Sequence, residues 1–398
     1  MVITSMNKKI IRASTIGASL NTFCFGLLSE LKEKGYQVIA LSSPDNSLSV
    51  LGAREHVRTI GVPMERHISP VRDLVSFFRL IRVFFHEKPV MVHSMTPKAG
   101  LLCMMAAWVA RVPVRVHTFT GLVFPTAKGL TKKVLMATDW LTCACATHVI
   151  PEGQGVLNDL KNNGITSKPM MVLGYGNVMG VDMNRFSRRP EVMEKAALLQ
   201  KKDVFSFVFV GRIVGDKGIN ELVHAFKALL AQDLPQKARL VLVGNYESKL
   251  DPISSDSKQA IDSTPEIDAV GPQYGDDLLA WYAASDCFVF PSYREGFPNT
   301  VLEAGAMGLP SIVTDINGSR EIIIPYEKDR QGATGLMIPS HDADALLKAM
   351  AWMITHDSER NRMAANARPS IESRFEQHFV RQCLYDFYDE ILTEKEMS

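Results

Sequence analysis

The stretch from Cys287 to Thr314 reads "CFVFPSYREGFPNTVLEAGAMGLPSIVT", and it predicts how the second half of the chain folds. Its first residues, "CFVFPS", form an apolar run ending at a proline and a serine, which is typical of a buried strand. Pro298 suits the first position of a helix, where its missing N–H costs nothing. Gly308 suits the end of that helix, and "SIVT" then begins another strand. A strand, a helix and a strand in this order indicate a parallel α/β unit.

The same stretch places two carboxylates on either side of a Gly-Phe-Pro-Asn turn. Glu295 falls in the strand-to-helix loop, and Glu303 falls on the helix. The first N–H groups of this helix, from Asn299, Thr300 and Val301, lie at its positive end and suit an anion. For this segment alone, an ordinary loop with a solvated glutamate and a helical surface glutamate is an equally good interpretation.

Strand-like runs alternate with helical patterns from one end of the chain to the other, which predicts parallel sheets. The expected strands are KIIRAS, YQVIALSS, VMVHSM, VRVHTF and THVIPE in the first half, and VFSFVFVG, RLVLVG, IDAVG, CFVFPS and SIVTD in the second. A length of 398 residues favours two domains. A polar stretch over residues 180–202 marks the break. We therefore predict a first domain over residues 1–182, a second over 183–374, and a C-terminal helix over 375–398.

Composition excludes several classes of protein. The longest apolar run, Ala99 to Ala110, is too short to span a bilayer. Arg12 and the polar residues after it interrupt any signal-peptide core. Six cysteines lie mostly among apolar neighbours without a Cys-x-x-Cys pair, so we expect buried free thiols in a reducing cytosol.

Charge is unevenly distributed although the net charge is only +1. Residues 1–150 hold 18 Lys and Arg against 8 Asp and Glu, whereas residues 151–398 hold 26 against 35. A basic first half indicates an anionic partner, either a membrane surface or a lipid substrate. Attraction between the two domains is the alternative. No recognition motif accompanies the charge, so nucleic acid is not expected as a partner.

Two segments could meet a membrane. The helix expected over Val71–His86 carries aromatic residues with interleaved arginines, but such a helix more often covers a sheet, and we favour that role. Lys128, Lys132 and Lys133 flank the apolar runs "GLVFP" and "VLMA" in a segment that we expect to be a loop. This lysine cluster is the better candidate for a membrane surface.

A second loop combines glycines with cations. After "VFSFVFVG" comes "GRIVGDKG", residues 211–218, and then a helix. The guanidinium of Arg212 can donate two parallel hydrogen bonds to phosphate oxygens, and Lys217 adds a compact positive charge. Such a loop is chemically a diphosphate clamp, although it lacks the Walker pattern. Ligands of parallel α/β sheets bind at the carboxyl ends of strands. Cations for a diphosphate and carboxylates for sugar hydroxyls therefore predict a nucleotide-sugar pocket.

These motifs resemble the retaining glycosyltransferases of family 4. The resemblance rests on Glu295-x7-Glu303, "GRIVGDKG" and "GFPNTVLEAGAMGLP", and extends to "VHSMTPKAGLL", "RVPVRVHTFTG" and "LGYGNVMGVDMNRF". It covers nearly the whole chain and includes members that build bacterial surface polysaccharides. It implies the GT-B fold, in which two Rossmann-like parallel-sheet domains face a central cleft and the C-terminal helix crosses back to the first domain.

The resemblance also implies roles for individual residues. Glu295 would contact the donor sugar, Glu303 the ribose hydroxyls, and Arg212 and Lys217 the leaving diphosphate. The remaining donor contacts would come from Gly17, Gly211, Val270, Gly271, Gly296, Phe297, Asn299 and Thr300. His117 would act as the active-site histidine near the reaction centre, with a structural strand-end histidine as the alternative. Lys98 would contact the acceptor phosphate, or else be a solvated lysine at a helix start.

Charge determines the expected mechanism. Negative charge that develops on the departing diphosphate can be stabilised by preorganised cations and amides. No metal or other cofactor is then required. Asp342-Ala-Asp344 spells a candidate metal motif, but it precedes a helix, and we expect Asp342 to be a cap. The resemblance implies retention of anomeric configuration by same-face attack, since no first-domain carboxylate is an evident nucleophile.

The resulting prediction is a cytoplasmic enzyme, peripheral on the inner face of the plasma membrane. It would move a sugar from a nucleotide donor, UDP-linked and with an N-acetylhexosamine as one candidate, onto a polyprenyl-diphosphate-linked glycan. A nucleotide-sugar epimerase of the same fold and a non-catalytic sugar-nucleotide-binding protein remain as alternatives.

Overall fold

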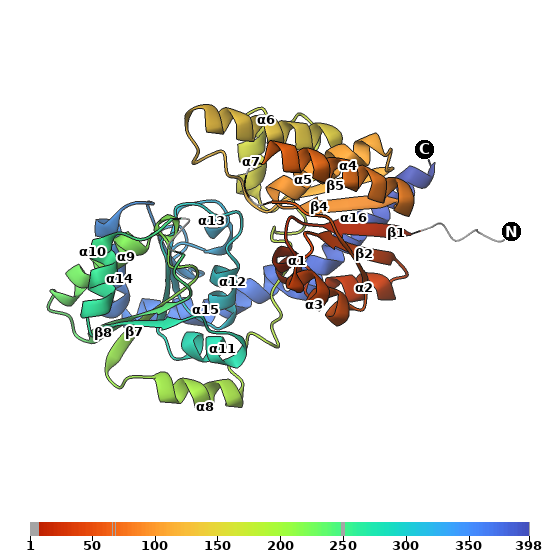
Figure 1. Cartoon of the computed structure of the whole chain (residues 1–398). Helices are drawn as coiled ribbons and strands as arrows, with labels where there is room; N and C mark the ends of the chain where they lie inside the picture. The colour runs from red at the N-terminus through yellow and green to blue at the C-terminus, as the bar shows by residue number, and fades with distance from the viewer. Residues whose placement is uncertain (1–7, 66, 68, 248–250, 398) are drawn as a thin grey trace. The chain divides into compact units, whose positions relative to one another are not determined.

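The computed structural model describes residues 8–65, 67, 69–247 and 251–397. The chain divides into two compact units (Figure 1). The first unit comprises Met1–Met179 together with Phe379–Ser398, and the second comprises Gly180–His378. The C-terminal segment thus belongs to the first unit, as the resemblance implied.

The first unit is built on a six-stranded parallel sheet in the order β3-β2-β1-β4-β5-β6. The strands are β1 (Lys9–Ala13), β2 (Gln37–Ser42), β3 (Arg58–Gly61), β4 (Met91–Met95), β5 (Val114–Phe119) and β6 (His148–Pro151). Ile11 of β1 aligns with Ile39 on one side and Val92 on the other. All three side chains are buried, because a parallel sheet covered by helices is apolar on both faces.

Helices cover both faces of this sheet. Those on one face share a core with its strands: α4 (Pro70–Glu87), α5 (Pro97–Val109), α6 (Gly129–Cys145) and α7 (Gln154–Asn162). Those on the other face build a separate core: α1 (Gly17–Phe23), α2 (Leu27–Glu33), α3 (Asn46–Glu55) and the C-terminal α16 (Gln377–Met397). The expectation that Val71–His86 covers a sheet is therefore confirmed, since Leu80 and Phe84 of α4 are buried.

The second unit repeats the plan with a six-stranded parallel sheet in the order β12-β11-β10-β7-β8-β9. Its strands are β7 (Val204–Val210), β8 (Lys237–Val243), β9 (Ile267–Gly271), β10 (Cys287–Phe290), β11 (Ser311–Thr314) and β12 (Gly335–Ile338). Its helices are α8 (Pro190–Leu199), η1 (Gly215–Lys217), α9 (Ile219–Leu230), α10 (Ser255–Ser263), α11 (Gly275–Ala283), α12 (Asn299–Ala306), α13 (Ser319–Ile322), α14 (Ala343–Thr355) and α15 (Asp357–Phe375). The predicted α/β fold class is confirmed in both units.

The strand order decides where the motif loops meet. The loop after β7 contains the predicted clamp, and the loop after β10 contains Glu295. Because β7 and β10 are paired parallel neighbours, both loops leave the same edge of the sheet at adjacent positions. This is the edge at which parallel α/β sheets bind ligands.

Candidate active site

Lys217 and Glu295 meet at this edge of the second unit. Their ammonium and carboxylate groups form an ion pair, and both side chains are largely buried. Ser292 donates its hydroxyl hydrogen to the same Glu295 oxygen at 2.7 Å. The Lys217 ammonium also lies 5.3 Å from the ring centre of Phe290, close enough for a cation–π contact. The two residues that the sequence assigned to the diphosphate and the sugar therefore share one site.

A glycine allows the two loops to approach. Gly218 has φ of +70°, a left-handed conformation that side chains disfavour. A Cβ atom at this position would also lie 2.1 Å from the carbonyl oxygen of Pro291. Gly218 thus meets both a conformational and a steric requirement. Its small size lets the turn of Lys217 lie directly against the start of the Glu295 loop.

Arg212 lies in the same clamp loop, with a side chain that is 46% exposed. Its guanidinium pairs with Glu247 at 2.9 Å and lies 4.0 Å from Asp216. Arg294 contacts the other oxygen of Asp216 at 3.4 Å. The sequence analysis missed Arg294, although it directly precedes Glu295. Among the described residues, this edge of the sheet therefore presents the cations of Arg212, Lys217 and Arg294, of which Arg212 is the most exposed.

Glu303 is partly buried on α12, and burial raises the pKa of its carboxyl to about 7. Tyr282 donates its phenolic hydrogen to this carboxyl at 3.1 Å, which pulls the pKa down, as does the nearby charge of Arg185. The carboxyl is thus poised between its protonated and ionised forms near neutral pH. The role of Tyr282 could not be found from the sequence, because it depends on packing between α11 and α12.

The start of α12 was expected to offer backbone groups to the donor, and this role stays a prediction. Pro298 precedes the first residue of the helix, Asn299, and its ring makes no capping hydrogen bond. Phe297 is buried, and its ring meets Phe375 edge-on at 5.5 Å. Only the backbone of Phe297 is therefore available to a ligand. Gly296 packs its carbonyl oxygen against Gly318, where a Cβ would lie 2.6 Å away.

Two glycines directly follow β7 and β8, a third ends β9, and backbone hydrogen bonds link these positions across the sheet edge. Gly211 donates its N–H to Val243, and Gly244 donates to Gly271, each at 3.0 Å. A Cβ at Gly244 would lie 1.8 Å from the Gly211 carbonyl oxygen. Val270, another expected donor contact, accepts a hydrogen bond on its carbonyl oxygen from the Gln273 amide at 2.9 Å. These residues lie at the same sheet edge as Lys217 but toward its β9 side.

His117 lies in the first unit and is enclosed. Its side chain is 1% exposed, and its ring fills the space above Gly100, where a Cβ would lie 2.4 Å from Cε1. Its Nδ1 is hydrogen-bonded to the Ser94 hydroxyl at 2.8 Å, and burial lowers its pKa to about 3. This neutral, packed ring fits the alternative of a structural histidine. It presents almost no surface with which to contact a sugar.

Gly17, expected to contact the donor, and Lys98, expected to contact the acceptor phosphate, are both engaged within the first unit. Gly17 donates its N–H to Asp45 at 3.1 Å, and a Cβ there would lie 2.4 Å from Leu48 N. Close packing of α1 on α3 thus accounts for this glycine. Lys98 pairs with both oxygens of Asp73, at 2.8 and 2.9 Å. Lys98 is therefore an ion-paired residue between α5 and α4, and not a solvated one.

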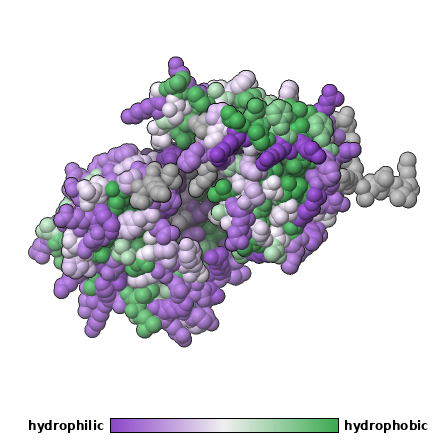
Figure 2. Space-filling model, in the orientation of Figure 1, coloured by the Kyte–Doolittle hydropathy of each residue, from purple (hydrophilic) through white to green (hydrophobic). Residues whose placement is uncertain are grey.

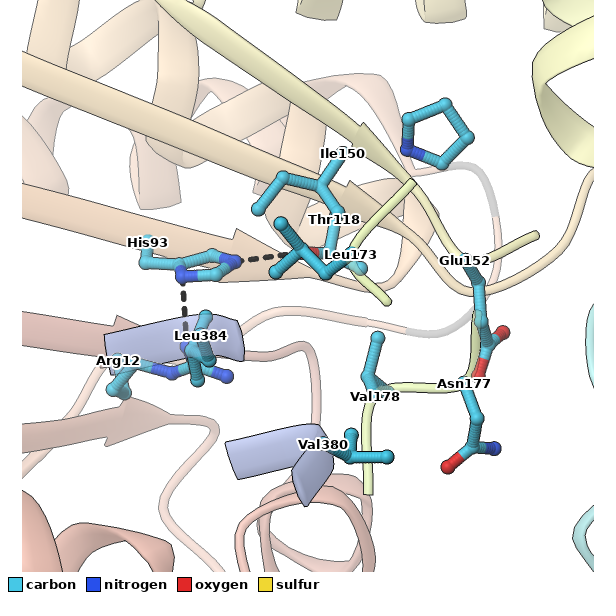
Figure 3. Close-up of a pocket in the computed structure, with 11 residues that line it drawn as sticks. Arg12, His93, Thr118, Ile150, Glu152, Leu173, Asn177, Val178, Val380 and Leu384 are labelled. Carbon is cyan, nitrogen blue, oxygen red and sulfur yellow. Dashed lines mark hydrogen bonds between the residues drawn. The ribbon is translucent and has the colours of Figure 1, made fainter. Parts of the chain in front are cut away.

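A polar network lies beside a small cavity in the first unit (Figure 3). Arg12 Nη1 donates to Tyr388 at 2.5 Å and to His93 Nδ1 at 2.7 Å. His93 Nε2 therefore carries the ring proton and donates to the Thr118 hydroxyl at 2.7 Å. Burial and the Arg12 charge lower the pKa of His93, so the ring is neutral. The cavity, about 20 Å³, has room for about one water molecule.

Asp342, part of the Asp-Ala-Asp sequence that could have been a metal motif, caps a helix. Asp342 accepts a hydrogen bond from the Ala345 N–H at 2.8 Å and precedes the first residue of α14. This is the geometry of an N-cap. The prediction for Asp342 is confirmed.

Comparison with known proteins identifies the family. Residues 192–370 match the family described as "Glycosyl transferases group 1", and residues 20–176 match the "Glycosyl transferase 4-like domain". The capsular polysaccharide biosynthesis glycosyltransferase CapM of Staphylococcus aureus is 30% identical over 396 residues, which cover 98% of this chain and 99% of CapM.

Two further proteins extend the comparison. A UDP-Gal:alpha-D-GlcNAc-diphosphoundecaprenol alpha-1,3-galactosyltransferase of Escherichia coli is 30% identical, covering 81% of each chain. Among solved structures, Anabaena HepE in complex with UDP aligns with a TM-score of 0.77 at 18% identity, covering 96% of this chain and 100% of HepE. That structure shares the fold. Together with the two family matches and the full-length similarity to CapM, the paired clamp and carboxylate loops show that this chain belongs to the GT4-like, group 1 family of glycosyltransferases.

Proposed function

We propose that this protein is a retaining glycosyltransferase that moves a sugar from a UDP-linked donor onto a polyprenyl-diphosphate-linked glycan during surface-polysaccharide assembly. The names of the similar CapM and of the E. coli galactosyltransferase support the process and the type of acceptor. The UDP in the HepE structure supports the nucleotide. An N-acetylhexosamine is the donor sugar that we would test first.

One observation carries the proposal: Lys217 and Glu295 form an ion pair at the adjacent ends of β7 and β10, with Arg212 beside them. A diphosphate brings two or three negative charges to this edge. It would compete with Glu295 for the Lys217 ammonium and with Glu247 for the Arg212 guanidinium. Release of Glu295 from its ion pair would leave its carboxylate free to accept a hydrogen bond from a donor-sugar hydroxyl.

The same exchange would favour the chemical step. As the bond between the sugar and the diphosphate breaks, negative charge grows on the leaving group. Cations held in place before the reaction stabilise this charge without reorganisation. We propose that Lys217 and Arg212 have this role without a metal ion, and that the acceptor attacks from the face that the diphosphate leaves. Product NMR would show the retained anomeric configuration, and activity should survive dialysis against EDTA.

We also propose that the enzyme works in the cytoplasm, peripheral to the inner face of the plasma membrane. A lipid-linked acceptor would require this location. No helix within the described parts of the chain has the length and apolar character needed to cross a bilayer. The excess of basic residues in the first unit would favour contact with anionic lipids.

The direct test is transfer of labelled sugar to a synthetic polyprenyl-diphosphate glycan. Lys217→Ala should lower kcat/KM by about 100-fold or more, because one stabilising cation is lost at the leaving group. Arg212→Ala should have an effect of the same kind. Lys195→Ala, which removes an exposed lysine paired with Asp277, is the matched control. Near-normal turnover by Lys217→Ala would contradict the proposed clamp.

The same assay distinguishes the rival functions. Without an acceptor, an epimerase would change the sugar of the free nucleotide donor, whereas a transferase would leave the donor intact or hydrolyse it slowly. A non-catalytic binding protein would be stabilised by the nucleotide sugar and form no product. An epimerised donor, or the complete absence of transfer with every lipid-linked glycan tested, would overturn the proposal.

A further inference from the structure

The outer face of α4 carries two parallel stripes of opposite character. Val71, Phe78 and Phe85 are spaced seven residues apart, so two turns of helix bring them onto one line. Their exposed fractions are 78%, 60% and 55%. Leu74 and Val75 lie beside them and are also exposed. These five residues form what we call the apolar stripe.

Basic residues form the second stripe. Arg72, Arg79 and His86 each follow one member of the first line by a single residue, and Arg82 lies between the two lines. Among residues that the structure describes, neither Arg79 nor Arg82 has an ion-pair partner. Arg79, Arg82 and His86 line a groove between α4 and the edge strand β3. We call these four residues the basic stripe.

The helices beside α4 continue this character. Trp108 of α5 and Leu130 and Trp140 of α6 are more than half exposed. Lys128 and Lys133, near the start of α6, are exposed as well. Figure 2 shows hydrophobic surface gathered over this helical layer, with hydrophilic side chains among it. The predicted lysine cluster and α4 thus belong to the same helical layer of the first unit.

Few carboxylates lie at this surface. Glu65, which precedes α4, is partly exposed and pairs with Arg72. The three helices contain only Asp73, Glu87 and Asp139, and all their residues are described. Asp73 is paired with Lys98, while Glu87 and Asp139 are buried. The helix α16 packs on the opposite face of the sheet, and its sequence has five acidic residues and two basic ones. The first unit therefore has one outer face that is both apolar and basic.

We propose that the α4–α6 face is the surface by which this protein lies on an anionic lipid bilayer. The apolar stripe enters the boundary of the acyl chains, and the basic stripe meets lipid phosphates. An exposed helix with apolar and basic sides that lies in the plane of the interface has this pattern. A second copy of the chain is a less suitable partner. A twofold dimer through α4 would bring the basic stripes of both copies into the same interface, where their like charges repel. This inference rests on the proposed function in one respect, because a lipid-linked acceptor is the reason why the enzyme would need to reach a membrane.

Vesicle sedimentation with the full chain tests the proposal. We expect binding to vesicles of 70% phosphatidylcholine and 30% phosphatidylglycerol, with weaker binding to phosphatidylcholine alone. Phe78→Ser with Phe85→Ser should weaken binding to both by at least about tenfold, since the buried apolar area is lost. Arg79→Gln with Arg82→Gln should remove the preference for phosphatidylglycerol and most of the salt dependence.

Two controls make the result decisive. Leu198→Ser removes an 87% exposed leucine from α8 in the second unit, and Lys195→Gln removes an exposed lysine from the same helix. Both should bind vesicles like the wild type. Brominated lipids should quench Trp108 fluorescence, and Trp108→Phe should reduce the quenching.

Stabilisation by UDP separates this proposal from the proposed function. The stripe variants and Trp108→Phe should keep the UDP-induced rise in melting temperature, because the altered residues lie in the first unit. Wild-type binding by the double phenylalanine variant would overturn the membrane face. The same conclusion would follow if light scattering showed a dimer that dissociates when Phe78 and Phe85 are changed. If UDP does not raise the melting temperature of the wild type, the proposed UDP donor is wrong, and the membrane face is unaffected.

Discussion

At the scale of single residues, Glu303 makes nucleotide binding sensitive to pH. Burial raises the pKa of the Glu303 carboxyl to about 7. Its expected role, accepting hydrogen bonds from the ribose hydroxyls, requires the ionised form. The ionised fraction grows from about a tenth at pH 6 to about nine tenths at pH 8. We therefore expect UDP affinity to rise about tenfold over this range, and binding to release a fraction of one proton that becomes smaller as the pH rises. Calorimetry in buffers of different ionisation enthalpy measures both quantities.

Two substitutions test this origin of the pH dependence. Glu303→Gln should give weaker binding with a flat pH profile. Tyr282→Phe removes a hydrogen bond that lowers the pKa, so the midpoint of the profile should move to higher pH. The folded pKa exceeds the unfolded value, so this group's contribution to stability is present below about pH 4.5 and is lost as the pH rises through 7. A sloping profile in Glu303→Gln would assign the effect to another group.

Residue identity alone could predict the clamp but not the surroundings of each side chain. Lys217 and Glu295 were correctly expected at one sheet edge, because parallel strands fix where their loops emerge. His117 lies on a strand, where neighbouring side chains alternate between faces. The sequence could not show that its ring faces Gly100 within the core. Gly17 likewise has a packing role that depends on α3, a separate helix.

At the scale of elements, the sequence located ten of the twelve strands that the described residues form. The two that it missed are β3 (Arg58–Gly61) and β12 (Gly335–Ile338), and each has four residues. Both lie at an edge of their sheet, where one side of a strand has no neighbour. Edge strands are often short, and β3, Arg-Thr-Ile-Gly, also has a weak apolar pattern, whereas β12, Gly-Leu-Met-Ile, is apolar but too short to stand out. The helix expected over 298–307 is observed as Asn299–Ala306, because proline and glycine mark its ends.

The cap of α14 gives a prediction at this scale. Asp342→Ala removes the hydrogen bond to the Ala345 N–H and should lower the free energy of unfolding by about 1 kcal/mol. Urea denaturation followed by circular dichroism measures the change. Transfer activity should stay near that of the wild type, with or without added Mn²⁺. Loss of activity that Mn²⁺ restores would instead make Asp342 a metal ligand.

At the scale of the whole molecule, the chain has two units with separate hydrophobic cores. Such proteins often unfold in more than one transition. The proposed UDP contacts at Lys217 and Arg212 lie in the second unit. The C-terminal helix α16 instead packs into the first unit, where Tyr388 is bonded to Arg12 and His93. Ligand and C-terminal helix should therefore stabilise different transitions.

Differential scanning calorimetry can separate the two effects. UDP at 100 times its Kd should stabilise the second unit by about 2.7 kcal/mol, because it binds only the folded state. Tyr388→Phe should destabilise the first unit by about 1–3 kcal/mol, since Arg12 and His93 lose a buried partner. At about 2–4 °C per kcal/mol for units of this size, both shifts are measurable.

The direction of the two shifts is what matters. UDP should raise one melting transition and leave the other near its original temperature, and Tyr388→Phe should lower the transition that UDP does not move. Tyr274→Phe, at a tyrosine of the second unit that is 74% exposed, is the control and should move neither. If UDP and Tyr388→Phe shift the same transition, the two units unfold together. The nucleotide site and the C-terminal helix would then be coupled through a single cooperative fold.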